Sequence, residues 1–453
     1  MSLKEADAPT VVFIAYHHPP SVEIGARRVG ALTSCLASQD LHVIVVSWFA
    51  AGQPPAYSAA AGRVTPIQIP ESRKWTTRGL VAAKKRLRGI WTHRHAVSAV
   101  QSSEGGARPR ETALPGRISR WRGELLRFIE CVDRHKMWSW RAAWSAYFAS
   151  KRFNARAVIA SGPPMTNLLA GFWVARLRRI PFIADFRDPW YAGFERMPGP
   201  SAFERRLRSS LERMLLERST AITVTTAALA ERLSATYPRA AAKIHVVRNG
   251  FDGLPRHPPT ATGHRLRFLY AGEIYLTRDP FPFLAALERL VASPSTDSSR
   301  ISVTFVGECA SYRGVLLADW LRGRKCEGLV RVLPPVTPAI VEAMAAESSV
   351  LLNLAQGSPL IVPAKTYEHL ASGREVLVMC QAGGGTARLI EGIPGVISVD
   401  PSDDASLDRA LADLYRRHVE LGELTAPPAA MIQAFSRDLQ TREFLQLARS
   451  TLR

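Results

Sequence analysis

The chain has 453 residues, of which 47% are hydrophobic and 22% are charged. Because a single hydrophobic core stops growing at about 250–300 residues, this length predicts two domains. The formal net charge of +20 implies attraction to an anionic partner, which would be nucleic acid, anionic lipid or a polyanionic substrate. No apolar run approaches the roughly 20 residues of a membrane-spanning helix, so the sequence predicts none.

The cysteines and the N-terminus indicate the compartment. The chain has five cysteines, which are Cys35, Cys131, Cys309, Cys326 and Cys380. They are scattered, odd in number and without a CxxC pair, which favours reduced thiols over a disulfide framework or a zinc site. The first ten residues hold an acidic pair and no hydrophobic block, so we expect no secretory signal. A cytoplasmic location is predicted.

Short apolar runs alternate with helical stretches in the first half of the chain. Val11–Tyr16 has the composition of a buried parallel strand, and a helical stretch leads to a second such run at His42–Phe49. A strand–helix–strand unit of this kind implies a right-handed crossover. Further strands are expected at Ala155–Gly162, at Pro181–Phe186, at Ala221–Thr226 and in KIHVVRNGFD.

Pro, Gly and Thr concentrate near Asp252–His264, which predicts a domain boundary. A second alternation follows, with strands expected at Arg267–Glu273, Ile301–Glu308 and Ser349–Ala355. The alternation predicts an α/β protein with two Rossmann-like, doubly wound domains that face each other across a ligand crevice. The predicted parts are an N-terminal domain at 1–252, a C-terminal domain at 264–425 and a C-terminal helix at 426–453 that crosses back to the first domain.

The stretch Ser72–Arg122 breaks the alternation and is interpreted as a basic insertion at about 72–122. Its block RGLVAAKKRLRGIW places Leu80, Leu87 and Trp91 at helical spacing among lysines and arginines. A basic amphipathic pattern with tryptophan suits an anionic membrane surface. The following stretch WRGELLRFIECVDRHKMWSWRAAW adds aromatic residues and cations. The alternative is a helix that packs on its own domain with its cations in solvent.

Pro363–Gly373, PAKTYEHLASG, carries the strongest local signal. Proline is tolerated in the first turn of a helix, and Lys365 and Glu368 then share one helical face. The exposed N–H groups of a helix start, together with Lys365, suit a diphosphate, and Glu368 suits a ribose diol. The same spacing also fits an ordinary surface ion pair.

Two groups of polar residues follow expected strands of the first domain. Gly25 and Arg27 come after the first strand, where a glycine lets the backbone approach a phosphate, although Arg27 and Arg28 also fit the start of a solvated helix. The pair His17 and His18 would either line the crevice or serve the structure.

The segment ADFRDPW places Asp185, Arg187 and Asp188 at the carboxyl end of a strand, where open α/β sheets bind ligands. Asp188 is the candidate for orienting an acceptor hydroxyl or the sugar. The alternative is an internal Asp–Arg ion pair that pins the loop.

Several of these segments resemble one family of enzymes. VPAKTYEHLASGREVLVM resembles the nucleotide-sugar segment of the retaining glycosyltransferases of family 4, which have the GT-B fold and are typified by bacterial capsule, lipopolysaccharide and exopolysaccharide enzymes. YAGEIYLTRDPFPFLAALERL is similar to the first C-terminal strand, phosphate loop and helix of that family. SGPPMTNLLAG, PFIADFRDPW and HVVRNGFD resemble N-domain segments. The resemblance covers about residues 10–50 and 155–400.

The resemblance implies a retaining, hexosyltransferase-like enzyme that moves a sugar from a nucleoside-diphosphate sugar to a glycan or lipid-linked acceptor in cell-surface polysaccharide synthesis. Arg278 and Lys365 would bind the pyrophosphate, where fixed cations stabilise a leaving diphosphate. The fold needs no DxD pair, so no metal and no cofactor are expected. The predicted catalytic residues are Asp188, Arg278 and Lys365, the donor-binding residues are Gly25, Arg278, Lys365 and Glu368, and the acceptor-side residues are His17, Arg27, Asp185 and Arg187.

One position departs from the family. An acid usually stands eight positions before the glutamate of this motif, and this chain has Leu360 there. A non-catalytic GT-B-like protein that binds sugar nucleotides is therefore an alternative, although some branches of the family also lack the acid. A basic nucleic-acid-binding protein is a further alternative, but no helix-turn-helix, zinc or RNA-binding signature appears, so no nucleic acid is expected. Lipid-linked acceptors are common in the family, which implies peripheral binding to the inner face of the membrane.

Overall fold

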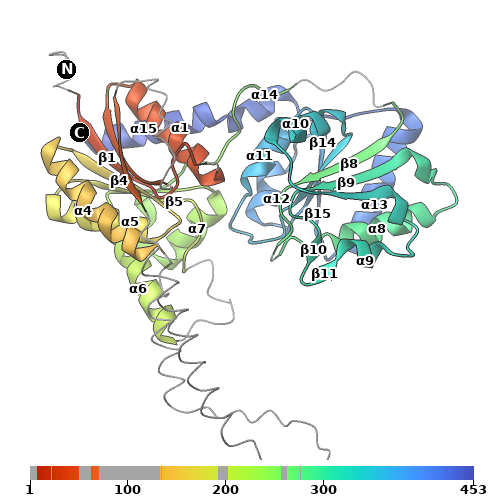
Figure 1. Ribbon diagram of the computed structural model, residues 1–453, viewed down its shortest axis with the longest axis horizontal. Helices are drawn as coiled ribbons and strands as arrows, with labels where there is room; N and C mark the ends of the chain where they lie inside the picture. The colour runs from red at the N-terminus through yellow and green to blue at the C-terminus, as the bar shows by residue number, and fades with distance from the viewer. Residues whose placement is uncertain are drawn as a thin grey trace, which may run out of the picture.

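The structure is a computed structural model, and it describes residues 8–21, 23–49, 63–70, 133, 135–191, 202–256, 263–275 and 277–452. Two parallel sheets, each covered by helices, form two Rossmann-like domains that lie side by side (Figure 1). The predicted fold class of two doubly wound α/β domains is confirmed. The predicted insertion at about 72–122 lies outside the described residues.

The first domain is built on a seven-stranded sheet in which all neighbours pair in parallel. In pairing order the strands are β3 (Val64–Pro70), β2 (His42–Phe49), β1 (Thr10–Ile14), β4 (Ala157–Gly162), β5 (Phe182–Phe186), β6 (Ala221–Val224) and β7 (Ile244–Val246). Its helices are α1 (Ile24–Ser38), α4 (Lys136–Arg152), α5 (Thr166–Arg178), α6 (Ala202–Arg218) and α7 (Ala227–Thr236). The strand order reverses between β1 and β4, and open sheets bind ligands at the carboxyl ends of the strands at such a point.

The second domain repeats this plan with six parallel strands. In pairing order they are β12 (Val330–Leu333), β9 (Ile301–Val306), β8 (Leu266–Ala271), β13 (Val350–Leu354), β14 (Glu375–Met379) and β15 (Val396–Val399), and a short hairpin joins β10 (Ser311–Tyr312) to β11 (Val315–Leu316). Its helices are α8 (Phe281–Ala292), α9 (Leu317–Leu321), α10 (Pro338–Glu347), α11 (Ala364–Leu370), α12 (Gly385–Ile390), α13 (Asp404–Tyr415) and α14 (Ala429–Ile432). The order reverses between β8 and β13.

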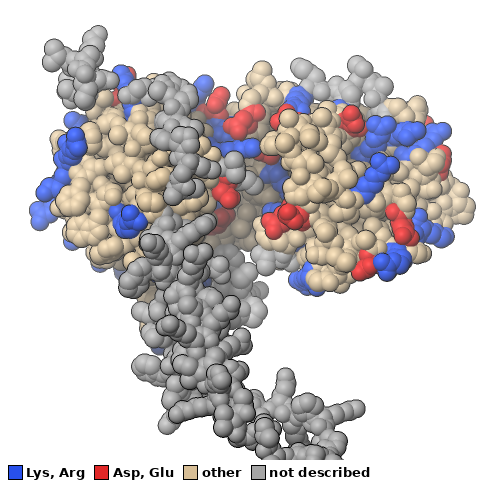
Figure 2. All heavy atoms as spheres, in the orientation of Figure 1, with Lys and Arg blue, Asp and Glu red and all other residues tan. Residues whose placement is uncertain are grey.

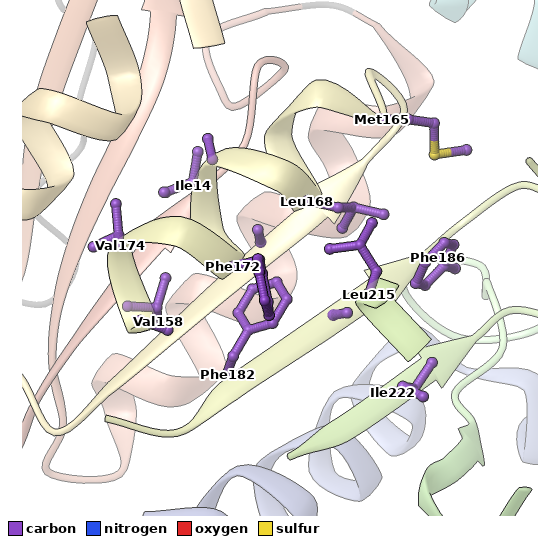
Figure 3. Packing of buried hydrophobic residues seen from close by; sticks show 14 of the residues in the cluster. Ile14, Val158, Met165, Leu168, Phe172, Val174, Phe182, Phe186, Leu215 and Ile222 are labelled. Atoms are coloured by element: carbon purple, nitrogen blue, oxygen red, sulfur yellow. The ribbon is translucent and has the colours of Figure 1, made fainter. Parts of the chain in front are cut away.

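The central strands are mostly apolar because helices cover both faces of each sheet. On β1, Val12 and Ile14 pack into the core on one face, whereas Val11 and Phe13 pack into the core on the other. Figure 3 shows the first of these cores, where side chains of α5 lie against β4 and β5. Alternate residues of one strand thus bury against different helices, which explains the continuous apolar runs of the sequence.

The last helix, α15 (Arg437–Leu452), returns to the first domain and packs beside α1 (Figure 1). Phe444 and Leu445 of α15 join the core that contains Val29 and Leu32 of α1. The predicted C-terminal helix that crosses back to the first domain is therefore confirmed.

The strand β3 and the helix α4 of the first domain were not predicted from the sequence. β3 contains Pro66 and Pro70 and is an edge strand, where a missing N–H is tolerated. In α4 the apolar residues lie on both the buried and the exposed face, so the chain shows no clear helical period there. The strands that were predicted begin or end within a few residues of their observed bounds.

A buried ion pair holds α1 against the end of β5. Asp185 is completely buried, and Arg28 Nη2 donates to its Oδ1 over 2.9 Å. The hydroxyls of Ser161 and Thr223 donate to the same carboxylate over 2.7 and 2.8 Å, and Arg28 also donates to the carbonyl of Arg248 over 2.9 Å. Burial alone would raise the pKa of Asp185, but Arg28 and the two hydroxyls hold it below its ordinary value.

We expect Asp185→Asn to lower the free energy of unfolding by about 3–5 kcal/mol, because the buried Arg28 loses its counter-ion. The direction in which this stabilisation changes with pH follows from the lowered pKa of Asp185. The ionised carboxylate stabilises the fold above its unfolded-state pKa of about 3.9, and this contribution is lost as pH falls through the lower folded pKa. In urea titrations, the gap between wild type and variant should therefore narrow in acid.

The matched control is Asp408→Asn, which breaks the exposed ion pair between Asp408 and Arg289. Pairs of this kind contribute about 0–1 kcal/mol. Equal decreases in the free energy of unfolding in the two variants would show that the buried pair of Asp185 and Arg28 stabilises the fold no more than an exposed ion pair.

Candidate functional site

The carboxyl ends of the two sheets meet across the interface between the domains. Arg27 at the start of α1 and Glu368 on α11 are joined by an ion pair of 3.1 Å. Arg388 on α12 pairs with Glu231 on α7 over 2.8 Å. Residues that follow β1 and β6 are thereby brought opposite residues that follow β13 and β14, at the carboxyl ends of the strands where open sheets bind ligands.

Lys365 lies on the second-domain side of this interface. Its Nζ is buried, makes no hydrogen bond to the described residues and lies 3.9 Å from the ring centroid of Tyr270. Burial, assisted by the nearby Arg278, lowers the pKa of Lys365 to about 7. Because an unpaired buried cation is costly, this ammonium is suited to anchor an anion. The helix α11 has only seven residues, so its dipole adds little to that anchor.

Arg278 comes from the loop after β8, as the sequence predicts. Its Nη1 donates to the carbonyl of Glu273 over 3.2 Å, and its guanidinium lies 4.5 Å from the ring centroid of Tyr275. The hydroxyl of Tyr270 donates to the same carbonyl over 2.8 Å. Within the described parts of the chain, neither Arg278 nor Lys365 forms an ion pair with a carboxylate, so two cations share one unneutralised edge of the sheet.

Gly307 allows the ends of β8 and β9 to approach closely behind Lys365. Its φ is +121°, and a Cβ at this position would overlap the carbonyl of Gly272. The thiol of Cys309 also donates to that carbonyl over 3.2 Å. The short motif Gly-Glu after β9 is thus the sequence signal for this close packing, and only the structure reveals its partner.

On the first-domain side, Arg187 is fixed by the turn after β4. Its Nε donates to the carbonyl of Gly162 over 3.2 Å, and its Nη2 donates to the carbonyl of Pro163. A Cβ on Gly25 would overlap the guanidinium, so Gly25 makes room for an arginine. Glycine was predicted here for approach to a phosphate, and its observed neighbour is Arg187.

Asp188 and His17 lie near Arg187 without hydrogen bonds of their own to the described residues. Burial raises the pKa of Asp188, and the charge of Arg187 only partly opposes this. Nδ1 of His17 is buried without a partner, and burial together with Arg187 lowers the pKa of His17. His18 differs, because its ring contacts the Thr33 hydroxyl at 3.1 Å and is part of the structure.

The pair Arg27 and Glu368 lies between these two groups, and both side chains are about half exposed. Loss of water around the carboxylate raises the pKa of Glu368, while Arg27 opposes the shift. Asp185, in contrast, is saturated by its donors below the surface, so it positions Arg28 and does not reach the interface.

Leu360 has a structural position that explains the missing acid. Its side chain packs into the core of the first domain, and its carbonyl accepts a hydrogen bond from the Thr226 hydroxyl over 2.6 Å. The preceding carbonyl, of Pro359, accepts from the N–H of Gly385 over 2.6 Å. A carboxylate at position 360 would be buried without a partner, so this loop docks the two domains through an apolar residue.

A cavity of about 100 Å³ remains beside this docked loop. It is lined from the first domain by Thr225 and Arg248, and from the second by Tyr367 and Arg388. Within the described ranges, no three His, Cys, Asp or Glu side chains form a metal-binding group. The polar side chains that line the cavity are hydroxyls and cations, which suit an anionic or hydroxylated ligand.

The comparisons with known proteins agree with this architecture. Residues 25–250 match the family model described as a glycosyl transferase 4-like domain. No curated protein is significantly similar in sequence.

Three solved structures match almost the whole chain. A glycosyltransferase from Rickettsia africae has a TM-score of 0.60 at 11% identity, with 99% of each chain covered. HepE from Anabaena, in complex with UDP and glucose, has a TM-score of 0.58 at 11% identity, with 98% of this chain and 100% of that chain covered. The lipopolysaccharide outer core galactosyltransferase WaaB, in its apo form, has a TM-score of 0.57 at 12% identity, with 97% and 99% covered.

At these identities the structures establish the GT-B fold, and the sequence match supplies the family. The chain therefore belongs to the glycosyl transferase 4-like family and is a glycosyltransferase of the GT-B fold.

Proposed function

We propose that this enzyme transfers a sugar, with retention of configuration, from a nucleoside-diphosphate sugar to a glycan or lipid-linked acceptor in cell-surface polysaccharide synthesis. The observation that carries the proposal is the pair of unneutralised cations, Lys365 and Arg278, at the switch point of the second sheet. The HepE structure contains UDP and glucose, which makes a UDP-sugar the first donor to test.

The two cations serve the departure of the diphosphate. As the glycosidic bond to the donor breaks, negative charge grows on the leaving phosphate, and fixed cations stabilise that charge more than they stabilise the bound donor. Lys365 has a pKa of about 7 in the free protein, so part of it is neutral at neutral pH. A bound diphosphate favours the charged ammonium, and donor binding is therefore expected to take up a proton.

Glu368 is proposed to receive the donor ribose. It is engaged by Arg27 in the free protein, but an exposed pair of this kind contributes only about 0–1 kcal/mol. A ribose diol that donates hydrogen bonds to the carboxylate can replace Arg27 at small cost. The same exchange frees Arg27 toward the acceptor.

The acceptor is proposed to bind on the first domain, where Asp188 and His17 have unused hydrogen-bonding capacity beside the fixed Arg187. Asp188 would orient the acceptor hydroxyl. Closure of the domains around both substrates would exclude water. A lipid-linked acceptor would bring this enzyme to the inner face of the membrane from the cytoplasm.

The alternative is a GT-B protein that binds sugar nucleotides without catalysis, which the absence of the first acid suggests. In this chain, however, Leu360 docks the domains, so the substitution has a structural reason of its own. Turnover of a donor by the purified protein would exclude the alternative.

The substitution Lys365→Met tests the diphosphate site. We expect thermal stabilisation of the wild type by one member of a panel of UDP-, GDP- and ADP-sugars, since a ligand that binds the folded state stabilises it. The variant should lose that stabilisation, and its turnover should fall on the order of 10²–10³-fold, as for the loss of one transition-state donor.

Lys325→Met is the matched control, because Lys325 is an exposed lysine of the same domain. It should retain both the stabilisation and the turnover. Full turnover by Lys365→Met, or stabilisation by none of the donors, would contradict the proposed function.

The substitution Lys365→Met should also change the pH dependence of protein stability in the absence of any ligand. The lowered pKa of Lys365 means that the unfolded chain binds a proton more readily than the folded chain between pH 7 and the ordinary lysine value of 10.5. Wild-type stability should therefore rise with pH across this window, relative to Lys365→Met. In thermal melts without donor, Lys365→Met should be more stable than wild type at pH 7, and the gap should shrink toward pH 10. A constant gap would show that Nζ is not desolvated.

A further inference from the structure

The outward face of α4 is a row of large apolar side chains. Trp140 is 64% exposed and Phe148 is 61% exposed, with Met137 and Trp144 on the same side of the helix. Trp144 lies 6.0 Å from the Trp140 ring centroid and 5.9 Å from that of Phe148, so the rings form a continuous ladder. Exposed apolar surface of this extent marks an interaction site.

The fold does not need this row, because α4 has a second apolar face. Trp138, Ala142 and Ala146 pack into the core of the first domain. The adjacent helix α5 lies beside α4 and adds Trp173 and Leu177, which are 53% and 66% exposed. We call the outward sides of α4 and α5 together the α4–α5 face.

The charge of this region has a single sign. Between Lys136 and Ala184 the sequence contains no aspartate or glutamate. It contains eight cations, which are Lys136, Arg141, Lys151, Arg152, Arg156, Arg176, Arg178 and Arg179. Figure 2 shows the first domain as a broad tan surface with blue side chains at its margins. The α4–α5 face is thus apolar and aromatic, and the charged side chains of the two helices are all cations, with Asp133 hydrogen-bonded to Thr166 at the start of α5.

We infer that the α4–α5 face docks on an anionic lipid bilayer. Tryptophan and phenylalanine insert at the level of the lipid headgroups, and lysine and arginine side chains are attracted to an anionic lipid surface. Neither property alone would select lipid. A protein partner would be met by a face with fewer cations, and a nucleic acid would not cover six large exposed apolar side chains. The combination of the two properties fits a membrane surface.

The contact is peripheral. Within the described part of the chain, no helix has the length and apolarity to cross a bilayer. The α4–α5 face therefore lies on the headgroup region with its helices parallel to the surface, and the buried face of α4 stays in the domain core.

The geometry also links this face to the candidate acceptor side. The His135 ring, at the start of α4, lies 4.2 Å from that of Tyr16, and Tyr16 contacts His17 ring to ring at 4.9 Å. The aromatic row thus begins beside the edge of the sheet that carries His17. An acceptor held in the membrane by a lipid would present its headgroup there, a consequence that rests on the proposed function, whereas the membrane contact does not.

Vesicle flotation of the full chain tests the inference without donor or acceptor. The wild type should float with phosphatidylcholine vesicles that contain phosphatidylglycerol, and much less with phosphatidylcholine alone. The triple variant Trp140→Ser, Trp144→Ser and Phe148→Ser should bind the anionic vesicles about tenfold or more weakly, since it loses the burial of three large apolar side chains in the bilayer. The double variant Arg176→Glu and Arg179→Glu should lose the preference for anionic lipid.

The matched control replaces three exposed apolar residues of the second half of the chain, as Ile340→Ser, Leu421→Ser and Met431→Ser, and should float like the wild type. Unweakened binding by the aromatic triple variant would overturn the inference and assign the contact to another part, such as residues 78–91. A wild type that floats with neither vesicle would also overturn it. So would a dimer, seen by light scattering, that the triple variant dissociates.

Fold and donor binding are checked separately. The triple variant should keep the wild-type circular dichroism spectrum and the wild-type stabilisation by a sugar nucleotide. If donor stabilisation is absent from both proteins while flotation differs, the proposed function fails and the membrane face stands.

Discussion

The buried pair of Arg28 and Asp185 is the contact on which the first domain's half of the site depends. Its hydrogen bonds reach β4, β5, β6 and the segment after β7. Because Arg28 belongs to α1, the same bonds fix that helix against the sheet. The start of α1 presents Arg27 to the second domain, and its outer side receives α15. Burying two charges is costly, and here every oxygen of the carboxylate has a donor, so the cost is offset by a fixed arrangement of four elements.

Lys365 shows the opposite condition, a buried ammonium that has no hydrogen-bond partner among the described residues and contacts only the ring of Tyr270 as a cation–π pair. Native structures leave few polar groups in this state, and those that remain call for a ligand or a catalytic role. The orphaned Nδ1 of His17 and the carboxylate of Asp188 lie on the facing domain. These three groups at the sheet edges have hydrogen-bonding capacity that a substrate could use, whereas Asp185, deeper in the first domain, has its capacity filled by protein donors.

The sequence predicted the fold well because each central strand is buried on both faces, which leaves continuous apolar runs such as Val11–Tyr16. The family resemblance implied that Lys365 and Arg278 would lie together, and in the structure both follow strands at the switch point of the second sheet. The sequence did not reveal the partner of Asp185, because Arg28 is far away in the chain and its burial depends on the sheet order. The docking of Leu360 was equally hidden, since its neighbours belong to the other domain.

The helix α4 was not predicted from the sequence, and the reason bears on its function. An amphipathic helix is recognised in a sequence by apolar residues that recur with the helical period and polar residues between them. The helix α4 lacks that period because the exposed Trp140 and Phe148 are as apolar as the buried Trp138. Folding accounts for the inner row only. The outer row raises the risk of aggregation in water, so its presence on a helix whose charged side chains are all cations requires a surface that covers it. The exposed apolar row of α4 therefore removes the helical period from the sequence, and the same row indicates the anionic lipid partner.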